Sequence, residues 1–274
     1  GVISRALDNE YLNPNHEKEC FDVNVLKTLF MIKYVKEIKA NIENITSLMV
    51  SNVNDDRMAL AQQVEDALKR LVRQTLVQKN GDIYVFLTDE EQDIQKDINN
   101  TVVDTASIVE KIAQMIYADI YQTKKFRHGI YDFDFDKMVD GVTTGAVTGG
   151  MKLRFLTVAT DAVEKSELRL MTESKGQAIV ILSGASYYEA LEKAMKIRKF
   201  VKQRNVSQLP KSVQDIIRNQ QDEAGHYELA AMEDLKKAIT DAAFYIDGEH
   251  VEIKSGEAKS RIDQALEYLV SHVY

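Results

Sequence analysis

The amino-acid sequence predicts a helix-rich α+β fold that consists of two parts. Residues 1–100 contain three amphipathic helical patterns followed directly by a β-hairpin, which is the element order of a winged-helix-like unit. Residues 101–274 place most strand patterns before long helical ones, which predicts an α+β domain with a small, mostly antiparallel sheet and long helices. We expect the boundary between the two parts near Asn100.

The helices of the first part follow from the spacing of apolar residues and from a capping residue. Between residues 21 and 39 apolar side chains recur every three or four positions, with Lys33 on the opposite, polar side. Asn41 is a candidate N-cap for a second helix over residues 42–49, because its side-chain oxygen can accept a hydrogen bond from a free backbone N–H group. A third amphipathic helix is predicted over residues 57–74.

Residues 76–87 predict a β-hairpin, because two runs rich in β-branched and aromatic residues flank an Asn-Gly pair. Asn80 and Gly81 can supply the positive φ angles that a two-residue type I′ turn requires. The pattern of a capping box over residues 88–91 then predicts a long helix that reaches about Tyr121 and is interrupted near Asn100.

Strand patterns come first in the second part of the sequence. Period-two alternation and short apolar runs predict strands over residues 131–135, 152–158, 168–172 and 177–182. Residues 141–150 are predicted to be a loop. The remaining patterns predict helices over residues 187–204, 212–243 and 257–273, and a hairpin over residues 244–253 that turns at Asp247-Gly248.

The composition is that of a globular protein from a reducing compartment. Of the 274 residues, 45% are hydrophobic and 28% are charged, and no apolar stretch approaches the roughly 18 residues that a membrane span needs. The single cysteine, Cys20, excludes an internal disulfide, so we expect a cytoplasmic protein. Because the chain starts with Gly1 and ends in an apolar helical run, we expect it to be part of a longer protein.

Two glycine- or aspartate-containing segments imitate ligand-binding loops. Residues 145–150 have the glycine spacing of a phosphate loop, but Lys152 stands one position too late for the lysine of that motif and no hydroxyl residue follows it. Asp132, Asp134 and Asp136 imitate the start of a calcium loop, but the glycine and glutamate that the loop needs further on are missing. We therefore interpret the first segment as a connection and the second as a strand with one wet face.

The other candidate motifs are equally incomplete. Glu223 and His226 have the spacing of a di-iron ligand pair, but such sites need a second copy of the motif. Ser183 does not lie in a G-x-S-x-G nucleophile elbow, and a lone cysteine such as Cys20 is usually a small core residue. The sequence therefore predicts no catalytic residue, no cofactor-binding residue and no metal ligand.

Two basic groupings are candidate contacts to nucleic acid or to a partner protein, although the formal net charge of −8 disfavours wholesale coating by DNA. The first grouping lies where a winged helix would meet a DNA backbone, with acidic residues interspersed, and consists of Lys69, Arg70, Arg73 and Lys79. The second lies on one helix without intervening acidic residues and consists of Lys193, Lys196, Arg198, Lys199, Lys202 and Arg204. For the first grouping the alternative is a winged helix that serves as a packing or lid module, and for the second it is a solvated helical face.

Four segments resemble one known protein family. They are residues 20–41, residues 78–93 across the predicted hairpin, residues 131–135 and residues 244–249. All four segments resemble the BrxC family, the large P-loop proteins of BREX phage-exclusion systems. These proteins are called PglY in related systems. These segments are architectural and contain no catalytic motif. The family's nucleotide-binding motif matches no position in the chain.

The resemblance implies a large cytoplasmic parent ATPase that binds ATP and Mg²⁺ outside these residues and acts with other BREX components. These would include a DNA methyltransferase and a phosphatase-like protein, and an oligomeric parent is compatible with the resemblance. The function we expect is a non-catalytic interaction and regulatory region that couples the ATPase to partner proteins or DNA. The alternative is a winged-helix module that binds duplex DNA directly.

Overall fold

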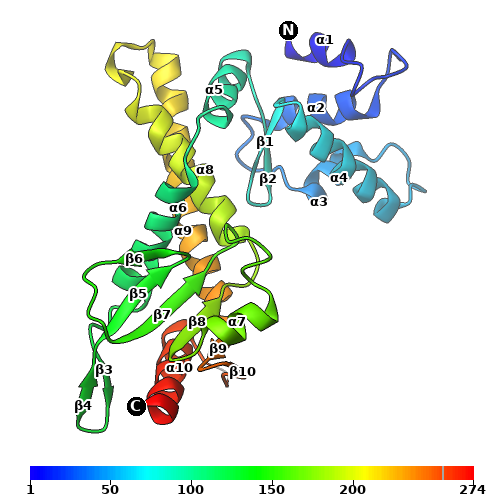
Figure 1. The fold of residues 1–274 in the computed structure, drawn as a ribbon. Coiled ribbons are helices and arrows are strands. Elements are labelled where there is room, and N and C mark those ends of the chain that lie inside the picture. The colour runs from blue at the N-terminus through cyan, green and yellow to red at the C-terminus, as the bar shows by residue number, and fades with distance from the viewer. Residues whose placement is uncertain (255) are drawn as a thin grey trace. The chain divides into compact units, whose positions relative to one another are not determined.

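The computed structural model describes residues 1–254 and 256–274, and these divide into two compact units. The first unit comprises residues 1–100 and 205–219, and the second comprises residues 101–204 and 220–274 (Figure 1). Each unit has its own apolar core. The fold is helix-rich α+β, as the sequence predicts, and no helix in the described ranges is both long and apolar enough to cross a membrane.

The first unit is mainly helical. It contains α1 (Val2–Leu7), α2 (Phe21–Ile32), α3 (Ile42–Met49), α4 (Arg57–Arg73), a hairpin of β1 (Val77–Asn80) and β2 (Ile83–Phe86), α5 (Asp89–Asn99) and the 3₁₀ helix η2 (Val206–Gln208). Helices α2, α3 and α4 precede the hairpin in the predicted order, and the short helix α1 before them was not predicted. The assignment of this unit to the winged-helix class stays a prediction.

The core of the first unit explains why its helices pack together. Helices α2, α3 and α4 contact one another, and the contacts are made by fully buried side chains that include Leu26, Ile45 and Leu68. The predicted N-cap is confirmed, because the Asn41 side chain accepts a hydrogen bond of 2.9 Å from the Asn44 backbone N–H group.

Helix α2 ends at Ile32, so the prediction of a helix through residue 39 is wrong. The reason is Lys33, which does not lie on a polar face. Its side chain is only 7% exposed; its ammonium group donates to the Phe86 carbonyl and lies 2.6 Å from a Glu91 carboxylate oxygen. This contact with the end of β2 and the start of α5 redirects the chain.

The hairpin forms as predicted, but its turn lies one residue later. Asn80 pairs with Ile83 in the ladder, so Gly81 and Asp82 are the two turn residues. Gly81 has a φ angle of +62°, a conformation that a side chain disfavours. After the hairpin, the capping box at Thr88 and Glu91 is confirmed, and the helix that it opens, α5, ends at Asn99.

The second unit is built around a six-stranded sheet (Figure 1). Its helices are α6 (Thr105–Gln114), the π-helix η1 (Met115–Ile120), α7 (Glu167–Glu173), α8 (Ser186–Lys202), α9 (Lys211–Thr240), which begins in the first unit, and α10 (Ala258–Val273). Its strands are β3 (Phe126–His128), β4 (Tyr131–Phe133), β5 (Phe135–Val139), β6 (Val142–Thr144), β7 (Met151–Leu156), β8 (Gln177–Ile181), β9 (Ala243–Ile246) and β10 (Glu249–Val251).

The sheet is mixed, with parallel pairs at its centre and antiparallel pairs towards its edges. The strand order is β10-β9-β8-β7-β5-β6; β5, β7 and β8 are parallel neighbours, and the other pairs are antiparallel. Strands β3 and β4 form a separate hairpin. The central place predicted for residues 177–182 is confirmed by β8, and the turn predicted at Asp247-Gly248 is confirmed between β9 and β10.

Three sequence predictions in this unit are wrong. Residues 168–172 lie in helix α7 and not in a strand. Leu170 is buried while Leu168 is 80% exposed, although a strand would have placed both side chains on the same face. Residues 131–135 are divided between β4 and β5 at Asp134, whose carboxylate pairs with Lys125 at 3.2 Å. Residues 141–150 include the edge strand β6.

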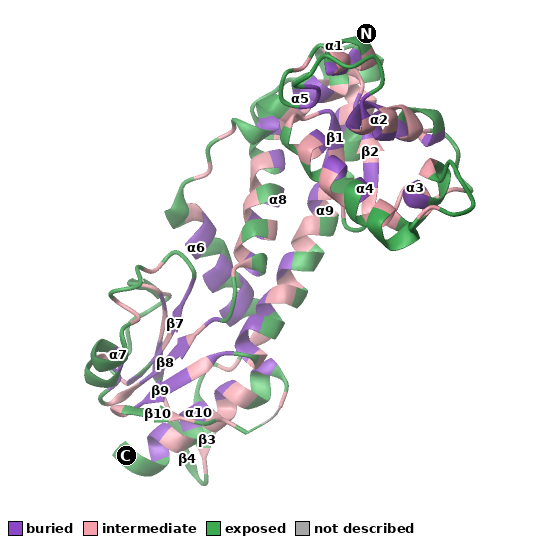
Figure 2. Cartoon of the chain, turned by 90° about the vertical axis from the view of Figure 1, so that its right-hand side faces the viewer, coloured by how far each residue is buried: buried purple, intermediate pink, exposed green. Residues whose placement is uncertain are grey.

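One face of the sheet carries the main core, and Figure 2 shows the buried positions on the helices and strands that form it. Apolar residues of β5, β7, β8 and β9 pack there against α6, η1, α8, α9 and α10. On the other face a smaller cluster joins α7 to the sheet through Leu170, Leu156 and Ile179.

The π-helix η1 places a tyrosine hydroxyl against the backbone of the sheet. Tyr117 is buried, and its hydroxyl lies 2.9 Å from the carbonyl of Met138 in β5 and 2.8 Å from the carbonyl of Leu153 in β7. The same oxygen accepts a hydrogen bond of 3.1 Å from the Met138 N–H group. Burial raises the pKa of Tyr117 far above its ordinary value, so the hydroxyl keeps its proton and bridges the two parallel strands.

Replacement of Tyr117 by phenylalanine should destabilise the second unit. The substitution keeps the ring but leaves buried backbone groups of β5 and β7 without their partner, which costs about 1–3 kcal/mol. Urea unfolding followed by circular dichroism would measure this change against Tyr131→Phe, in which the lost hydroxyl belongs to a residue that is 66% exposed. Equal stability of the two variants would contradict the bridging role.

Candidate functional site

The first basic grouping is largely occupied by contacts within its own unit. Arg70 in α4 forms a two-pronged ion pair with Asp22 in α2, with nitrogen–oxygen distances of 2.7 and 2.9 Å. Asp22 is only 5% exposed, so the pair joins two core helices. The hydrogen bonds to Asp22 raise the pKa of Arg70 further. Arg70 is therefore a structural residue whose guanidinium is already engaged.

The three other residues of this grouping also have neighbours. Lys69 lies 3.0 Å from Glu65 and 3.8 Å from Asp66 on the same helix, so its charge is neutralised locally. Arg73 donates a hydrogen bond of 3.1 Å to the Tyr11 hydroxyl, and the Lys79 ammonium lies 5.7 Å from the centre of the Tyr84 ring. The structure brings the four cations into one unit without forming an uninterrupted positive surface.

The second basic grouping lies along α8, and two of its members hold neighbouring segments of the second unit. Arg198 forms a two-pronged pair with Glu228 in α9, at 3.0 and 3.1 Å. Lys199 donates a hydrogen bond of 2.5 Å to the carbonyl of Val102, in the segment before α6. Both side chains are exposed, and both connect α8 to other parts of its unit.

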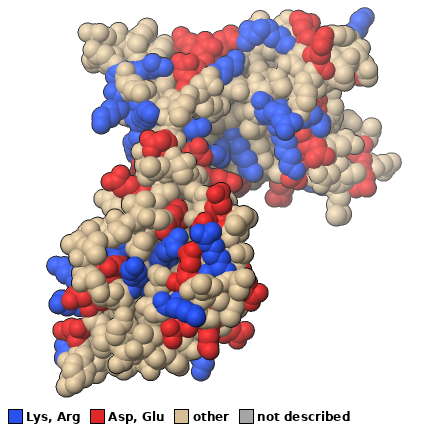
Figure 3. Space-filling model, viewed as in Figure 1, with Lys and Arg blue, Asp and Glu red and all other residues tan. Residues whose placement is uncertain are grey.

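The remaining members of the α8 grouping differ in the contacts that their side chains make. Lys196 lies 3.8 Å from Glu192, the Lys193 ammonium lies 5.6 Å from the Tyr227 ring centre, and the Arg204 guanidinium lies 4.1 Å from the Phe200 ring centre. Within the described residues, Lys202 has neither an ion pair nor a side-chain hydrogen bond. Figure 3 shows basic and acidic side chains interspersed on the visible faces.

The segment over residues 145–150 is the connection from β6 to β7. Asp136 in β5 is buried, and its carboxylate accepts hydrogen bonds of 2.6 Å from the Thr148 N–H group and 2.7 Å from the Thr148 hydroxyl. These bonds, the backbone one first, lower the pKa of Asp136. A side-chain carboxylate thus occupies donors that a phosphate would need, in agreement with our interpretation of the segment as a connection.

The other candidate motifs show no convergence of ligands. Asp134 pairs with Lys125 and Asp136 binds Thr148, so the aspartates of the apparent calcium loop have different partners. Glu223 lies 3.5 Å from His226 on one helix. Cys20 is buried and donates from its thiol to the Leu12 carbonyl at 3.1 Å. Across residues 1–254 and 256–274 no group of three or more His, Cys, Asp or Glu side chains could hold a metal ion.

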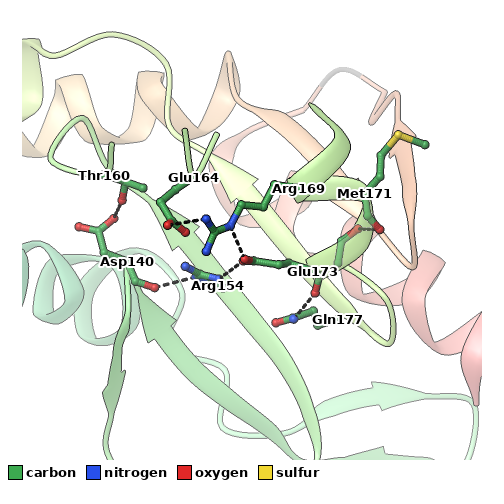
Figure 4. A network of polar contacts seen from close by, with 9 residues as sticks. Asp140, Arg154, Thr160, Glu164, Arg169, Met171, Glu173 and Gln177 are labelled. Carbon is green, nitrogen blue, oxygen red and sulfur yellow. Dashed lines mark hydrogen bonds and ion pairs between the residues drawn. The ribbon is translucent and has the colours of Figure 1, made fainter. Parts of the chain in front are cut away.

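A polar network that sequence reasoning missed lies at the carboxyl ends of β5 and β7 (Figure 4). The Asp140 carboxylate accepts hydrogen bonds from the Thr157 N–H group at 2.7 Å, the Thr157 hydroxyl at 2.8 Å and the Thr160 hydroxyl at 2.6 Å. The Asp140 carbonyl accepts from Arg154 Nε at 2.7 Å. This edge of a parallel sheet is where many α/β proteins bind ligands.

The rest of the network shows that its charges are satisfied by one another. Arg154 pairs with Glu173 at 2.9 Å, and Arg169 pairs with Glu173 at 2.7 Å and with Glu164 at 2.8 Å. Arg169 contributes most to the lowered pKa of Glu173. The network therefore fastens α7 and the preceding loop to the sheet. No sequence motif marks it, because its members are distant along the chain and α7 was predicted to be a strand.

The first unit exposes an apolar surface that sequence reasoning also missed. We call it the α2-end surface and define it by four nearly consecutive residues at and after the end of α2: Phe30 (53% exposed), Met31 (75%), Tyr34 (77%) and Val35 (38%). Phe30 also packs edge-on against Phe86, with ring centres 5.1 Å apart. The sequence pattern put Val35 on the apolar face of a helix through residue 39, but α2 ends at Ile32 and Val35 lies outside it.

A groove lies beside the α2-end surface. It has a volume of about 320 Å³ and is lined on one side by the segment after α2 and on the other by β2. Apolar groups such as Ile38 and Tyr84 contribute to its lining, together with Lys36 and Lys39, which are exposed. Lysines outnumber acidic residues in the lining, where Asp82 is the acidic one.

Replacement of Arg70 by methionine should destabilise the first unit. It leaves the buried Asp22 carboxylate without a counter-charge, and because Arg70 is itself partly exposed we expect a loss of about 1–3 kcal/mol. Lys69→Met, next to it on α4, removes only exposed ion pairs with Glu65 and Asp66 and should change stability much less. Urea unfolding at pH 7 would compare the two, and equal losses would show that the Arg70–Asp22 pair has no special structural role.

Comparison with known proteins assigns the chain to a family. A family model described as the BREX ATP-binding protein BrxC 4th domain with six-stranded beta sheet matches residues 101–269, which is more than half of the chain. The second unit contains a six-stranded sheet within this range, as that description states. No solved structure matches the chain. The chain therefore belongs to the BrxC family of BREX ATP-binding proteins.

Proposed function

We propose that this chain is a non-catalytic docking region of a phage-defence ATPase, which couples the ATPase to another protein component of the BREX system. In this proposal ATP and Mg²⁺ bind outside these residues, and the region acts in the cytoplasm. Membership of the BrxC family supports the association with a phage-defence ATP-binding protein. The choice of a protein partner depends on the surface of the first unit.

The observation that carries the proposal is the α2-end surface. Large apolar side chains that cluster on an exposed surface are characteristic of protein–protein interfaces, whereas single exposed ones are ordinary. Met31 in α2 and Tyr34 just after its end are more than two-thirds exposed, although α2 buries Leu26 and Leu29 completely or almost so. Tyrosine and methionine are also enriched in the central parts of interfaces. Burial of this surface by a partner would remove apolar area from water.

The adjacent groove indicates the chemistry of the partner. Its apolar lining suits an apolar side chain, and Lys36 and Lys39 at its rim suit acidic residues on either side of that side chain. This basic rim belongs to a chain whose formal net charge is −8, so an acidic partner would meet favourable charges here and unfavourable ones over much of the remaining surface. We therefore propose that the partner presents an apolar residue within an acidic segment.

Direct binding of duplex DNA is the second candidate function, and the α8 grouping favours it. Lys202 and Lys193 are exposed and have no ion pair among the residues that the structure describes, so they are available for phosphate contacts. Against this function, Arg70, Lys69, Lys196 and Arg198 already face carboxylates that would compete with phosphate. The positive charge available to DNA is therefore much smaller than the sequence suggests.

The docking proposal predicts that Met31→Asp together with Tyr34→Asp separates partner binding from ATP hydrolysis. Made in the full-length BrxC protein, the double variant should reduce co-purification of BREX components at least tenfold, because two charges are placed in an apolar contact. ATP hydrolysis and the thermal midpoint should stay near those of the unmodified protein, since both residues are exposed.

The matched control is Val163→Asp together with Leu168→Asp, which introduces the same charges at residues that are 72% and 80% exposed in the second unit. Unchanged co-purification in the control and a loss in the α2-end variant would support the proposal. A loss in both variants, or in neither, would contradict it.

The DNA alternative predicts a different result for Lys193→Glu together with Lys202→Glu. If the α8 grouping binds DNA, the double substitution should weaken duplex binding by the 274-residue chain several-fold in a gel shift and reduce the dependence of that binding on salt. Absence of salt-sensitive DNA binding by the unmodified chain would exclude this alternative.

A further inference from the structure

Lys137 occupies an unusual position in the second unit. It lies in β5 between Phe135 and Val139, and successive side chains of a strand point to opposite faces. Phe135 is 3% exposed and Val139 is fully buried, and both belong to the main core. The alternation therefore places a lysine on the core-facing side of the sheet, where an apolar residue is expected.

The Lys137 ammonium lies close to two aromatic rings. Its nitrogen is 5.5 Å from the ring centre of Phe135 and 5.6 Å from that of Tyr117. Aromatic faces attract a cation, but they do not replace the hydrogen bonds that an ammonium group makes with water or a carboxylate. No carboxylate pairs with Lys137 among residues 1–254 and 256–274. Burial lowers its pKa, and the nearby positive charge of Lys124 lowers it further.

A cavity of about 700 Å³ opens beside this lysine. Its lining includes Tyr117 of the π-helix and Lys137, together with residues of α6, β6 and α8. Hydroxyl groups of Ser107 and Thr144 and apolar groups such as Met195 share the lining. The volume lies within the range of pockets that hold small molecules, and the mixture of apolar walls with a few polar groups is typical of such pockets.

The charges around the cavity favour an anion. Lys111 belongs to the lining, and Lys124 is near enough to affect Lys137. Glu110 is the acidic residue of the lining, but it is exposed on α6 and forms no ion pair with Lys137. An incoming anionic group would supply the missing counter-charge for Lys137 and would reduce the repulsion between Lys137 and Lys124. An apolar portion of the same molecule could lie along Tyr117 and Met195.

We propose that this cavity is a binding site for a small organic anion, in which a phosphate or carboxylate group contacts Lys137 and an apolar body fills the remaining space. The site lies within the matched family region but uses none of the residues of the α2-end surface, so it is independent of the docking function. The geometry explains why β5 has a lysine where the pattern of the sheet calls for an apolar side chain.

The test uses pyridoxal 5′-phosphate as a reporter, because it combines an anionic phosphate with a flat ring and an aldehyde. The Lys137 amine adds to the aldehyde, water leaves, and borohydride then reduces the resulting C=N bond to a stable secondary amine. Peptide mapping by mass spectrometry locates the adduct. We expect labelling of Lys137 in preference to the other lysines, and we expect phenyl phosphate or benzoate, but not chloride at equal ionic strength, to suppress it.

Binding without covalent chemistry is measured in parallel by thermal shift with phenyl phosphate and benzoate, which also distinguishes the two anionic groups. Lys137→Met, which keeps the apolar stem, should fold and should bind the better of these anions about tenfold more weakly or worse. Lys152→Met, in the neighbouring strand β7 at an exposed position, is the matched control and should bind normally.

The proposal is overturned if labelling of the lysines follows their exposure, if neither anion competes, or if Lys137→Met binds as tightly as the unmodified chain. If Lys137→Met does not fold, the conservative variant Lys137→Arg, which keeps the charge, replaces it in the binding measurement. Retained anion binding in Lys137→Arg together with weaker binding in Lys137→Gln, which removes the charge, would support the site, and unaffected binding in Lys137→Gln would exclude it.

Discussion

The parallel pairing of β5 with β7 is the constraint on which most of the second unit depends. Parallel neighbours must be joined by a connection that returns the chain to the same end of the sheet, and a helix usually makes it. Here the return is made by β6 and residues 145–150 without a helix. The chain must therefore pass very close to the start of β5. A Cβ atom at Gly150 would lie 2.3 Å from the carbonyl oxygen of Asp134, so only glycine fits.

The same constraint explains the buried polar groups around these strands. Asp136 holds the returning segment through its hydrogen bonds to Thr148. At the opposite ends of the strands, Arg154 binds the carbonyl of Asp140. The Tyr117 hydroxyl bridges the strand backbones from the helical side. A short connection without a helix leaves backbone and side-chain donors that need partners, because unpaired buried polar groups are costly. The polar network of Figure 4 is thus understandable as part of the fold without an enzymatic role.

Local chemistry made much of this fold predictable, and non-local pairing accounts for most of what was not. Asn41, the capping box at Thr88 and the turn at Asp247-Gly248 act through neighbours within a few residues, so their effect can be inferred from the sequence. Lys33 ends α2 through contacts with Phe86 and Glu91, which are more than fifty positions away. A periodicity argument cannot detect such a contact. The short helix α7 was missed because its sequence also fits an alternating strand.

The candidate basic sites show the same limit of prediction from sequence, here for charged side chains. A sequence counts cations but does not show which of them face carboxylates, and Arg70 and Arg198 meet Asp22 and Glu228, which are 48 and 30 positions away. Their charges are used to hold helices together, and a partner that needed them would first have to break those pairs. Lys33 is engaged in the same way at the end of α2, whereas Lys36 and Lys39, only a few residues further on, remain exposed beside apolar side chains. Whether a lysine of this protein is available to a partner therefore depends on which carboxylates the fold places near it. The surfaces available for binding are those whose charged groups have no ion-pair partner within the fold or whose apolar groups stay exposed.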